Sequence, residues 1–446
     1  MLNSPPRSRP SRRDVLRWGS VAGVATPALA ACSGMSTSGA SGSGVSFLTT
    51  QFTPVEETRN LRAILNRAYE PGAQLVAGDS SQLGTQVRSQ ADSGHVQIDV
   101  IAGLHGDFAM LGEDYLTDLS GLMTDLAGRG YSPDLLELAK LGTRRTWYVP
   151  WCQASYLICA RKSALEHLPS GADVDTLTYE QYLDWAIAAR KANGGKPAFG
   201  LPAGPEGLLA RFVQGHLYPS FTGGVVTEFR SAKAVTMWQY LRDLWANTVP
   251  SSTNYNFMQE PLTSGEVSVA WDHVARLVEA PRKHPEEWVM APNPAGPKGR
   301  GYMSVVLGLG IPRGAPHLDA AKDLLRALAK PTAQIDLLRK NSFFPAVKAP
   351  IPPDLPPAIR LESDALHAQQ TAPRAILSLP PVGLGRHDGE MSKIFTDAFA
   401  AIVLNHQDIR RTLDAQARNM QSILDEVKVP CWSPDPVRAD TNCTVG

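Results

Sequence analysis

The sequence lacks two features that would assign it to large functional classes: an excess of basic charge, and a long apolar run beyond residue 31. It holds 43 Lys and Arg against 43 Asp and Glu. Residues 1–31 contain five of the basic and one of the acidic residues, so the remainder carries 38 and 42, a net charge of −4. A nucleic-acid partner would require a basic excess or stripe, so none is expected. The 415 residues after position 31 are enough for two ordinary domains.

Catalytic and metal-binding motifs are also scarce. The chain has no HExxH, no GxSxG and no GxxxxGK[ST], and Gly308-Leu309-Gly310 with Gly314 misses the dinucleotide-binding spacing. The ten histidines form no i,i+4 pairs of the kind that bind metal. Arg386-His387-Asp388 carries acid–base side chains, but adjacent loop residues rarely converge on one substrate atom, so a solvated loop is expected. The sequence therefore predicts no enzyme, no metal site and no cofactor.

Cysteines are few, and their spacing excludes a CxxC or CxxH metal site. Cys431 and Cys443 flank a proline-rich tail, where a disulfide would fasten the end of the chain. Cys152 and Cys159 fall on what reads as one strand. Seven extended residues span about 23 Å, which is far beyond disulfide reach, so these two are expected to be buried small hydrophobic residues.

The first 44 residues have the pattern of an export and anchoring segment. Arg12-Arg13 heads a mildly apolar stretch over residues 15–31 that is too short for a membrane span, as in a twin-arginine signal. Leu29-Ala30-Ala31-Cys32 matches a bacterial lipobox, whose cysteine receives diacylglycerol. Residues 33–44 are a Ser/Gly-rich flexible linker. We expect a signal peptide over 1–31, a lipidated Cys32, and attachment at the extracytoplasmic face of the cell membrane.

The ordered part begins with strands that alternate with helices. Strands are predicted over 45–50, 74–77 and 96–102, with helices over 55–69 and 83–91 between them. This alternation is typical of an α/β lobe with a parallel sheet. A later strand is predicted over 154–160, and further helices begin after Thr178, end before Pro331, and cover 413–427.

Polar and aromatic side chains follow the ends of these strands. In open α/β sheets ligands bind beyond the carboxyl ends of the strands. Flat aromatic rings stack on sugar faces while Asp, Gln and Arg bind hydroxyl groups, so this mixture suits a carbohydrate. The residues at such positions are Gln51, Asp79, His105, Asp107 and Trp151.

At these residues the chain resembles a family-1 extracellular solute-binding protein, the sugar-capturing subunit of a bacterial ABC importer. The resemblance covers essentially all of 45–428, and its leader is in the style of actinobacterial, mycobacteria-like lipoproteins. Five short motifs carry it in order: Trp147-Tyr148-Val149-Pro150 with the segment 157–165, then 177–182, 263–270 followed by Trp271-Asp272, 291–297, and Phe344-Pro345-Ala346. Cys159-Ala160-Arg161 departs from the family's Tyr-Asn-Lys, which changes the polarity there.

The resemblance implies a two-lobed α/β fold of the periplasmic-binding-protein type II, with the ligand cleft between lobes that close by hinge motion. It places 45–150 plus 304–345 in lobe 1, and 151–303 plus 346–446 in lobe 2. It also implies a monomer that delivers a sugar to permease transmembrane subunits with a cytoplasmic ATPase. The substrate-binding residues that it implies are Gln51, Asp79, His105, Asp107, Trp151, Glu206, Trp271, Asp272, Tyr302 and Arg386.

Other functions remain open at this point. The ligand could be an amino sugar, an oligosaccharide, a polyol or a glycerophosphodiester such as glycerophosphocholine, although few arginines are expected at the cleft. A secreted lipoprotein hydrolase would need a convergent nucleophile or carboxylate pair, which the sequence does not identify. An adhesin or scaffold lipoprotein would bind no small ligand.

Overall fold

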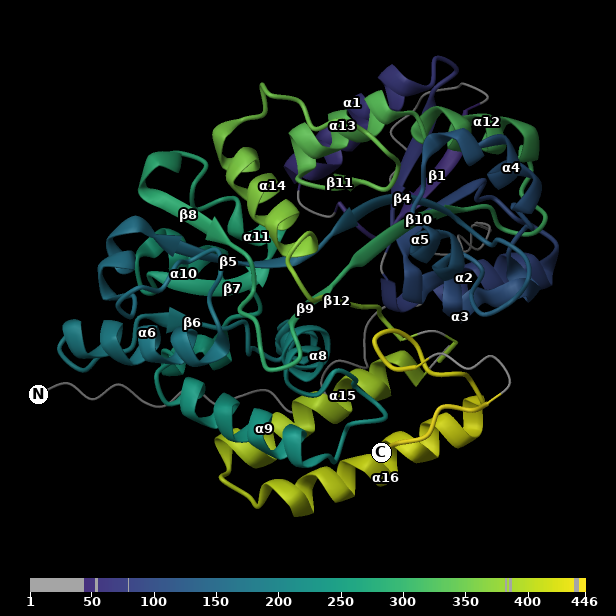
Figure 1. The fold of residues 1–446 in the computed structure, drawn as a ribbon. Helices are drawn as coiled ribbons and strands as arrows, with labels where there is room; N and C mark the ends of the chain where they lie inside the picture. Colours follow the sequence, from purple (N-terminus) through teal and green to yellow (C-terminus); the bar gives the residue numbers. More distant parts are fainter. Residues whose placement is uncertain (1–43, 53–54, 79, 382, 385–386, 437–440) are drawn as a thin grey trace, which may run out of the picture. The chain divides into compact units, whose positions relative to one another are not determined.

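The parallel strands predicted near the start of the chain form one side of a six-stranded sheet. The computed structural model describes residues 44–446 except 53–54, 79, 382, 385–386 and 437–440. Strand β1 (Val45–Thr49) lies between β2 (Ala73–Ala77) and β3 (Val100–Leu104) and is parallel to both. Helices α1 (Val55–Ala68) and α2 (Ser80–Ser93) connect these strands, as the alternating pattern predicted (Figure 1). The third strand begins four residues later than expected.

The other half of this sheet comes from distant segments and is antiparallel. Its order is β11-β4-β10-β3-β1-β2, where β4 is Val149–Ala154, β10 is Val305–Gly310 and β11 is Phe344–Pro345. β10 inserts between β3 and β4 and runs antiparallel to both. These pairings join residues about 150–200 positions apart in the chain. No local pattern could have predicted them.

A second sheet of four strands lies beside the first. Its order is β6-β7-β5-β8, with β6 Phe199–Gly200, β7 Val269–His273, β5 Tyr156–Arg161 and β8 Trp288–Ala291. A separate two-stranded ribbon pairs β9 (Arg300–Met303) in parallel with β12 (Ala375–Ser378). The chain passes from the first sheet to the second at Ser155, between β4 and β5, and from the ribbon to the first sheet at Ser304, between β9 and β10.

The strand predicted over 154–160 corresponds to β5, but the prediction that Cys152 and Cys159 lie on one strand is wrong. β4 ends at Ala154 and β5 begins at Tyr156, in different sheets, so Cys152 and Cys159 do not share a strand. Both cysteines are nevertheless free and fully buried, as predicted. The lobe boundary expected after residue 150 falls inside β4, which belongs entirely to the six-stranded sheet. Trp151 therefore lies on the first sheet and not on the second lobe, where it was expected.

Local signals explain several helix ends. Thr178 caps α6 (Tyr179–Ala192) in a capping box with Gln181, as predicted, and Pro331 ends the preceding helix segment and begins α13 (Pro331–Asn341). The remaining α-helices are α3 (His105–Tyr115), α4 (Ser120–Asp125), α5 (Pro133–Leu138), α7 (Leu209–Phe212), α8 (Tyr218–Thr222), α9 (Ala232–Trp245), α10 (Gln259–Ser264), α11 (Val274–Leu277), α12 (Leu318–Leu328), α14 (Pro357–Gln370), α15 (Asp388–Phe399) and α16 (Ile409–Val427). Among the described residues, we find no helix with the length and hydrophobicity to cross a membrane.

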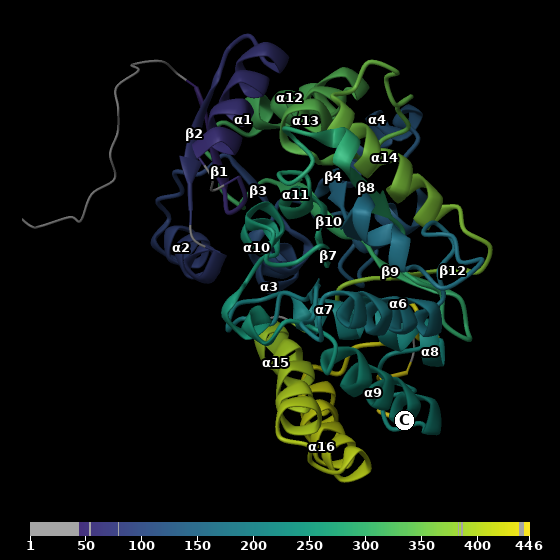
Figure 2. The same cartoon turned by 90° about the vertical axis from the view of Figure 1, so that its left-hand side faces the viewer.

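Two hydrophobic cores support the sheets. One surrounds the six-stranded sheet and continues onto one face of the second sheet, where α14 packs. The other fills the opposite face of the second sheet and includes α9, α15 and α16, which lie together (Figure 2). Because the first core is continuous across both sheets, the chain from 44 to 446 forms one unit by its contacts.

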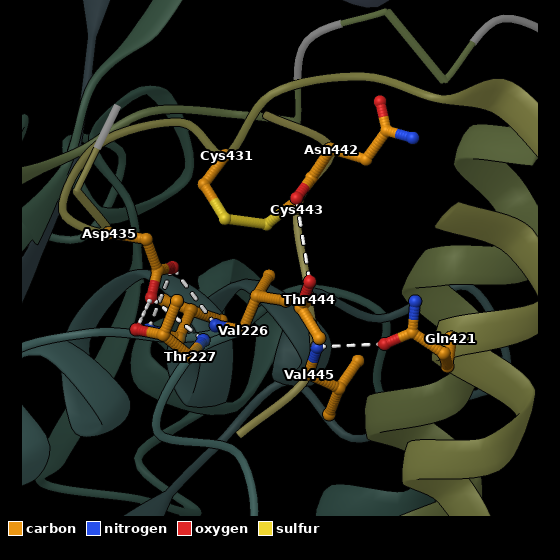
Figure 3. Close-up of a disulfide and its surroundings, with 10 residues drawn as sticks. Val226, Thr227, Gln421, Cys431, Asp435, Asn442, Cys443, Thr444 and Val445 are labelled. Atoms are coloured by element: carbon orange, nitrogen blue, oxygen red, sulfur yellow. Dashed lines mark hydrogen bonds between the residues drawn. A yellow bond between two sulfur atoms is a disulfide. The ribbon is translucent and has the colours of Figure 1, made fainter. Parts of the chain in front are cut away.

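The end of the chain is fastened at two points (Figure 3). A disulfide joins Cys431 to Cys443, in agreement with the sequence prediction. The buried carboxylate of Asp435 accepts hydrogen bonds from the backbone N–H groups of Val225, Val226 and Thr227 at 2.9–3.0 Å. The tail therefore holds the loop between α8 and α9 in place.

Candidate functional site

The carboxyl ends of β1 and β3 bring two of the predicted site residues together. Thr50 Oγ1 donates to Asp107 Oδ2 at 3.1 Å, and the Leu104 N–H donates to the same oxygen at 2.8 Å. Gln51 Nε2 donates to Thr50 Oγ1 at 3.2 Å. Because β1 and β3 are parallel neighbours, their ends meet at one edge, and Gln51 and Asp107 become linked through Thr50.

Burial shifts the pKa values of the acidic and basic groups at this edge toward their neutral forms. Burial raises the pKa of Asp107 to about 6, against the effect of its hydrogen bonds, and Asp388 nearby raises it further. Burial lowers the pKa of His105 to about 4, and its Nδ1 lies 3.0 Å from the Tyr148 hydroxyl. Asp388 is the first residue of α15, and Gly106 lies in the first turn of α3. A side chain at Gly106 would meet Asp388, because a β-carbon there would lie 4.0 Å from Asp388 Oδ2. The start of α15 thus faces the start of α3.

On the second sheet, Trp271 has a different environment from the one expected. Its side chain is fully buried on β7, and the Tyr156 ring stacks on it with 4.9 Å between centroids and 7° between planes. The Phe212 ring lies 4.7 Å away from it. Because neighbouring rings cover it, Trp271 presents no face to a sugar in this structure, and the expected stacking platform is corrected to a packing position under Tyr156.

Asp272 is occupied by the backbone. It is fully buried, and its Oδ2 accepts from the Met258 N–H at 2.6 Å while its Oδ1 accepts from the His273 N–H at 2.6 Å. Burial raises its pKa to about 7, partly offset by these bonds. The arrangement fixes the start of α10 against the end of β7.

A chain of aromatic contacts joins the two sheets. Trp151 on β4 lies 5.8 Å from Phe52, which lies 5.0 Å from Phe343. Phe343 lies 6.5 Å from His273, which contacts Tyr156 edge-on at 5.4 Å. These rings come from four separate segments, so the space between the sheets is lined by aromatic side chains.

Several buried polar atoms near these rings have no hydrogen-bond partner within the described part of the structure. They are Trp151 Nε1, Trp271 Nε1, and the Nε2 atoms of Gln214 and His216. Gln214 and His216 lie on a π-helical turn, Val213–Leu217, next to Trp271. Buried polar groups are normally paired, and π-helical turns are frequent at functional sites. The unpaired polar atoms and the π-helical turn both make the region near Trp271, between the sheets, a candidate for the ligand site.

A cavity of about 390 Å³ opens next to the aromatic chain. One wall comes from α1 and the end of α13, which pack on the six-stranded sheet. The other comes from α10, which precedes β7 of the second sheet, and from α11 and the residues after it, which follow β7. Its charged side chains are Glu56, Glu57, Glu279, Arg276, Arg282 and Lys340. We call it the interlobe cavity, because helices beside each of the two sheets line it.

An ion pair crosses the interlobe cavity. Arg276 lies 3.4 Å from Glu57 and also covers the Phe257 ring at 4.8 Å. Burial raises the pKa of Glu57, and Arg276 opposes that shift. Asn341 Nδ2 donates to the Glu57 carbonyl at 3.1 Å, while its buried Oδ1 has no partner among the described residues. Carboxylates, guanidinium groups and amides in one cavity can pair with the hydroxyl groups of a ligand.

The other predicted residues are placed as follows. Glu206 is exposed in a loop, where its N–H donates to Asn256 Oδ1, and it is not among the described residues that line the interlobe cavity. Tyr302 is half-buried on β9, in the two-stranded ribbon. Asp79, Arg386 and Cys32 lie outside the described residues.

The histidine of the Arg386-His387-Asp388 segment has its own ion pairs. Its Nδ1 lies 2.8 Å from Glu390 and its Nε2 lies 3.1 Å from Glu426, which raise its pKa. It lines a second cavity, of about 300 Å³, between α15 and α16. Within the described ranges the one group with metal-ligand spacing is His284, Glu286 and Glu287, which are all exposed.

Sequence reasoning missed the residues of the interlobe cavity. Arg276 comes four residues after Asp272, just past the end of β7, so the rule used for β1 and β3 would have identified it. Glu57 lies in the first turn of α1, five residues after Phe52. Tyr156 and Phe343 had no such signal, because their importance depends on the pairing of distant segments.

Comparison with known proteins supports the fold. A model of the bacterial extracellular solute-binding protein family matches residues 56–335, which is more than half of the chain. No curated protein sequence matches significantly. Among solved structures, maltose-bound MalE3 of T. maritima has a TM-score of 0.70 at 20% identity, covering 85% of this chain and 100% of that one.

Two further structures are similar. UgpB from Mycobacterium tuberculosis in complex with glycerophosphocholine has a TM-score of 0.67 at 17% identity, covering 86% of this chain and 98% of its own. A solute-binding protein from Agrobacterium vitis with bound D-mannitol has a TM-score of 0.66 at 14% identity, covering 88% and 100%. The two-sheet α/β architecture and the family match agree, and the chain belongs to the bacterial extracellular solute-binding protein family.

Proposed function

We propose that this protein is the substrate-binding lipoprotein of a bacterial ABC importer, and that it captures a sugar or sugar derivative between its two lobes. The interlobe cavity carries this proposal, because its walls come from helices beside each of the two sheets and the Glu57–Arg276 ion pair crosses it. A transport receptor must bind its ligand with both lobes if binding is to favour the closed arrangement. The loaded receptor would then deliver the ligand to the permease and its cytoplasmic ATPase.

The chemistry of the cavity suits a polyhydroxylated ligand. Three carboxylates and three cations cancel in charge, and their oxygens and N–H groups can bind hydroxyls as acceptors and donors. Its volume of about 390 Å³ falls within the range of small-molecule sites. Phe257 and the Phe343–Tyr156 aromatic chain supply apolar surface beside these groups. Gln51 and Asp107 would complete the site from the edge of the first sheet.

A glycerophosphodiester is a second candidate ligand. Arg276, Arg282 and Lys340 at the cavity are three cations that the sequence alone did not place there. Arg276 and Arg282 are already paired, with Glu57 at 3.4 Å and with Glu279 at 2.8 Å. A phosphate would have to compete with these carboxylates, so a neutral sugar remains our first choice.

A thermal-shift titration tests the proposal. We expect one of maltose, an amino sugar, D-mannitol or glycerophosphocholine to raise the melting temperature with increasing concentration, as binding to the folded state requires. Arg276→Gln should reduce this rise. The matched control is Arg326→Gln, since Arg326 pairs with Asp125 and Asp323 at 2.9 Å on a different surface and should leave binding unchanged.

Two results would contradict the proposal. No shift with any of these ligands would favour a scaffold or adhesin. Steady conversion of a ligand into product would establish an enzyme.

The anchoring part of the proposal rests on the leader. We expect Cys32→Ala to give an unlipidated protein that is released from the membrane, and Arg12→Lys with Arg13→Lys to block export. Mass spectrometry of membrane and culture fractions measures both. A Cys32→Ala protein that stays membrane-bound with unchanged mass would rule out the lipid anchor.

A further inference from the structure

A buried glutamine connects the points at which the chain passes between the sheets. Gln369 is the second-last residue of α14 and has no exposed surface. Its Nε2 donates to Ser155 Oγ at 3.1 Å and to the Tyr156 carbonyl at 3.3 Å. Its Oε1 accepts from the Asn293 N–H at 3.0 Å and from Asn293 Nδ2 at 2.6 Å. Since a backbone N–H can only donate, these partners fix which side of the amide is the oxygen.

The network continues from the first crossover to the second. Ser155 Oγ donates to the Met303 carbonyl at 2.7 Å, so the β4–β5 and β9–β10 crossovers are joined directly. On the side of the first sheet, Gln153 Oε1 accepts from Ser304 Oγ at 3.2 Å, and Gln153 Nε2 donates to the Pro345 carbonyl at 3.1 Å. The C-terminal end of α14 approaches the region where β9 and β12 meet the first sheet (Figure 1).

We infer that Gln369 is a positioning residue that ties the two crossovers into a single hinge. Ser155 and Ser304 are the single residues between the strands of the two sides, so rotation of the lobes must occur close to them. Asn293, which follows β8, anchors the amide of Gln369 to the second sheet. Gln153 on β4 anchors the opposite side. Held between them, the two crossovers rotate about one axis and not independently.

Burial makes this network selective for one arrangement. Gln369, Asn293 and Ser155 are at most 2% exposed, so water does not replace a hydrogen bond that is lost when a crossover moves alone. The inference rests on the proposed function, in which the lobes move about this hinge. It adds that the Gln369 side chain makes the β4–β5 and β9–β10 crossovers move together.

The test measures the ligand-free protein, so it does not depend on the identity of the ligand. Spin labels are attached at Lys191→Cys on α6, beside the second sheet, and at Asp323→Cys on α12, beside the first, so that they report the distance between the two lobes. The native Cys152 and Cys159 are buried and should not react with the label. In Gln369→Met, whose side chain has similar length but no amide, the population at the distance of the present structure should fall about tenfold relative to other distances. That factor corresponds to about 1.4 kcal/mol, close to the net contribution of one buried hydrogen bond.

Two further variants keep the test decisive. Ser155→Ala removes the hydroxyl that links Gln369 to Met303, and it should broaden the distance distribution even if Gln369→Met fails to fold. The double variant should be no broader than either single variant, because both disrupt one network. Thr222→Val is the control: its buried hydroxyl donates to the Tyr218 carbonyl at 2.8 Å within the second lobe, so its loss should lower the melting temperature but leave the distribution unchanged.

The outcomes separate this inference from the proposed function. If Gln369→Met and Ser155→Ala melt earlier but keep the wild-type distribution, as the control does, the positioning role is wrong. In a second arm, maltose, D-mannitol and glycerophosphocholine are added to the wild-type protein. If none of them changes its distances, the receptor proposal fails, and the ligand-free comparison still decides the role of Gln369.

Discussion

Replacing Trp271 by alanine distinguishes a packing residue from a ligand-stacking residue. Trp271 has no exposed surface, Tyr156 stacks on one face, and Phe212 and His216 contact it at 4.7 and 5.2 Å. Removing a fully buried tryptophan costs about 3–5 kcal/mol, because the lost contacts and the remaining cavity add. The loss of the stacked ring pair accounts for about 0.5–1.5 kcal/mol of this.

Urea denaturation followed by far-ultraviolet circular dichroism gives the change in the free energy of unfolding. The matched control is Trp245→Ala, since Trp245 is only partly buried and contacts Phe399 at its edge, so its loss should cost clearly less. Trp271→Phe keeps a ring against Tyr156 and should recover part of the stability.

The opposite result would refute this reasoning. If Trp271→Ala unfolds at the wild-type urea concentration but its ligand affinity falls by about 5- to 150-fold, as a loss of 1–3 kcal/mol implies, the ring stacks on ligand. The burial seen here would then describe only one of the arrangements of the two lobes.

Two other predictions concern pH and the C-terminal tail. Burial lowers the pKa of His216 from 6.5 to about 3, so between these pH values the unfolded state binds a proton that the folded state does not, and stability is lost as the pH falls. The difference in unfolding free energy between wild type and His216→Gln should therefore change by about 1.4 kcal/mol per pH unit below pH 6.5 and level off near pH 3. A constant difference in urea titrations across this range would contradict the lowered pKa. The Cys431–Cys443 disulfide closes a loop with a sequence separation of 12, so Cys443→Ser should cost about 2–4 kcal/mol and expose the tail to protease, whereas equal proteolysis of both proteins would show that the Asp435 contacts alone hold it.

Local patterns predicted the elements whose signals lie within a few residues. Alternation of strand and helix predicted β1 to β3 and their parallel direction, and the Thr178–Gln181 capping box predicted the start of α6. The pairing of Cys431 with Cys443 also followed from proximity in the sequence. Each of these features depends on residues that are close together in the chain, so it can be predicted from the local sequence.

The candidate site was predicted less completely, because its residues meet only through long-range pairing. Gln51 and Asp107 were found, since the ends of parallel neighbouring strands must share an edge. Glu57 and Arg276 are 219 positions apart, and no local pattern relates them.

Trp271 shows the same limit in another way. Alternation along a strand predicts that successive side chains point to opposite faces of the sheet. It does not predict which of the two faces another element covers. The sequence alone determined the first three strands, the helices between them, the start of α6 and the family motifs of this protein. The tertiary structure alone decided that Tyr156 covers Trp271, that the interlobe cavity carries three cations, and that Gln369 joins the crossovers, because burial and side-chain pairing exist only once distant segments are packed together.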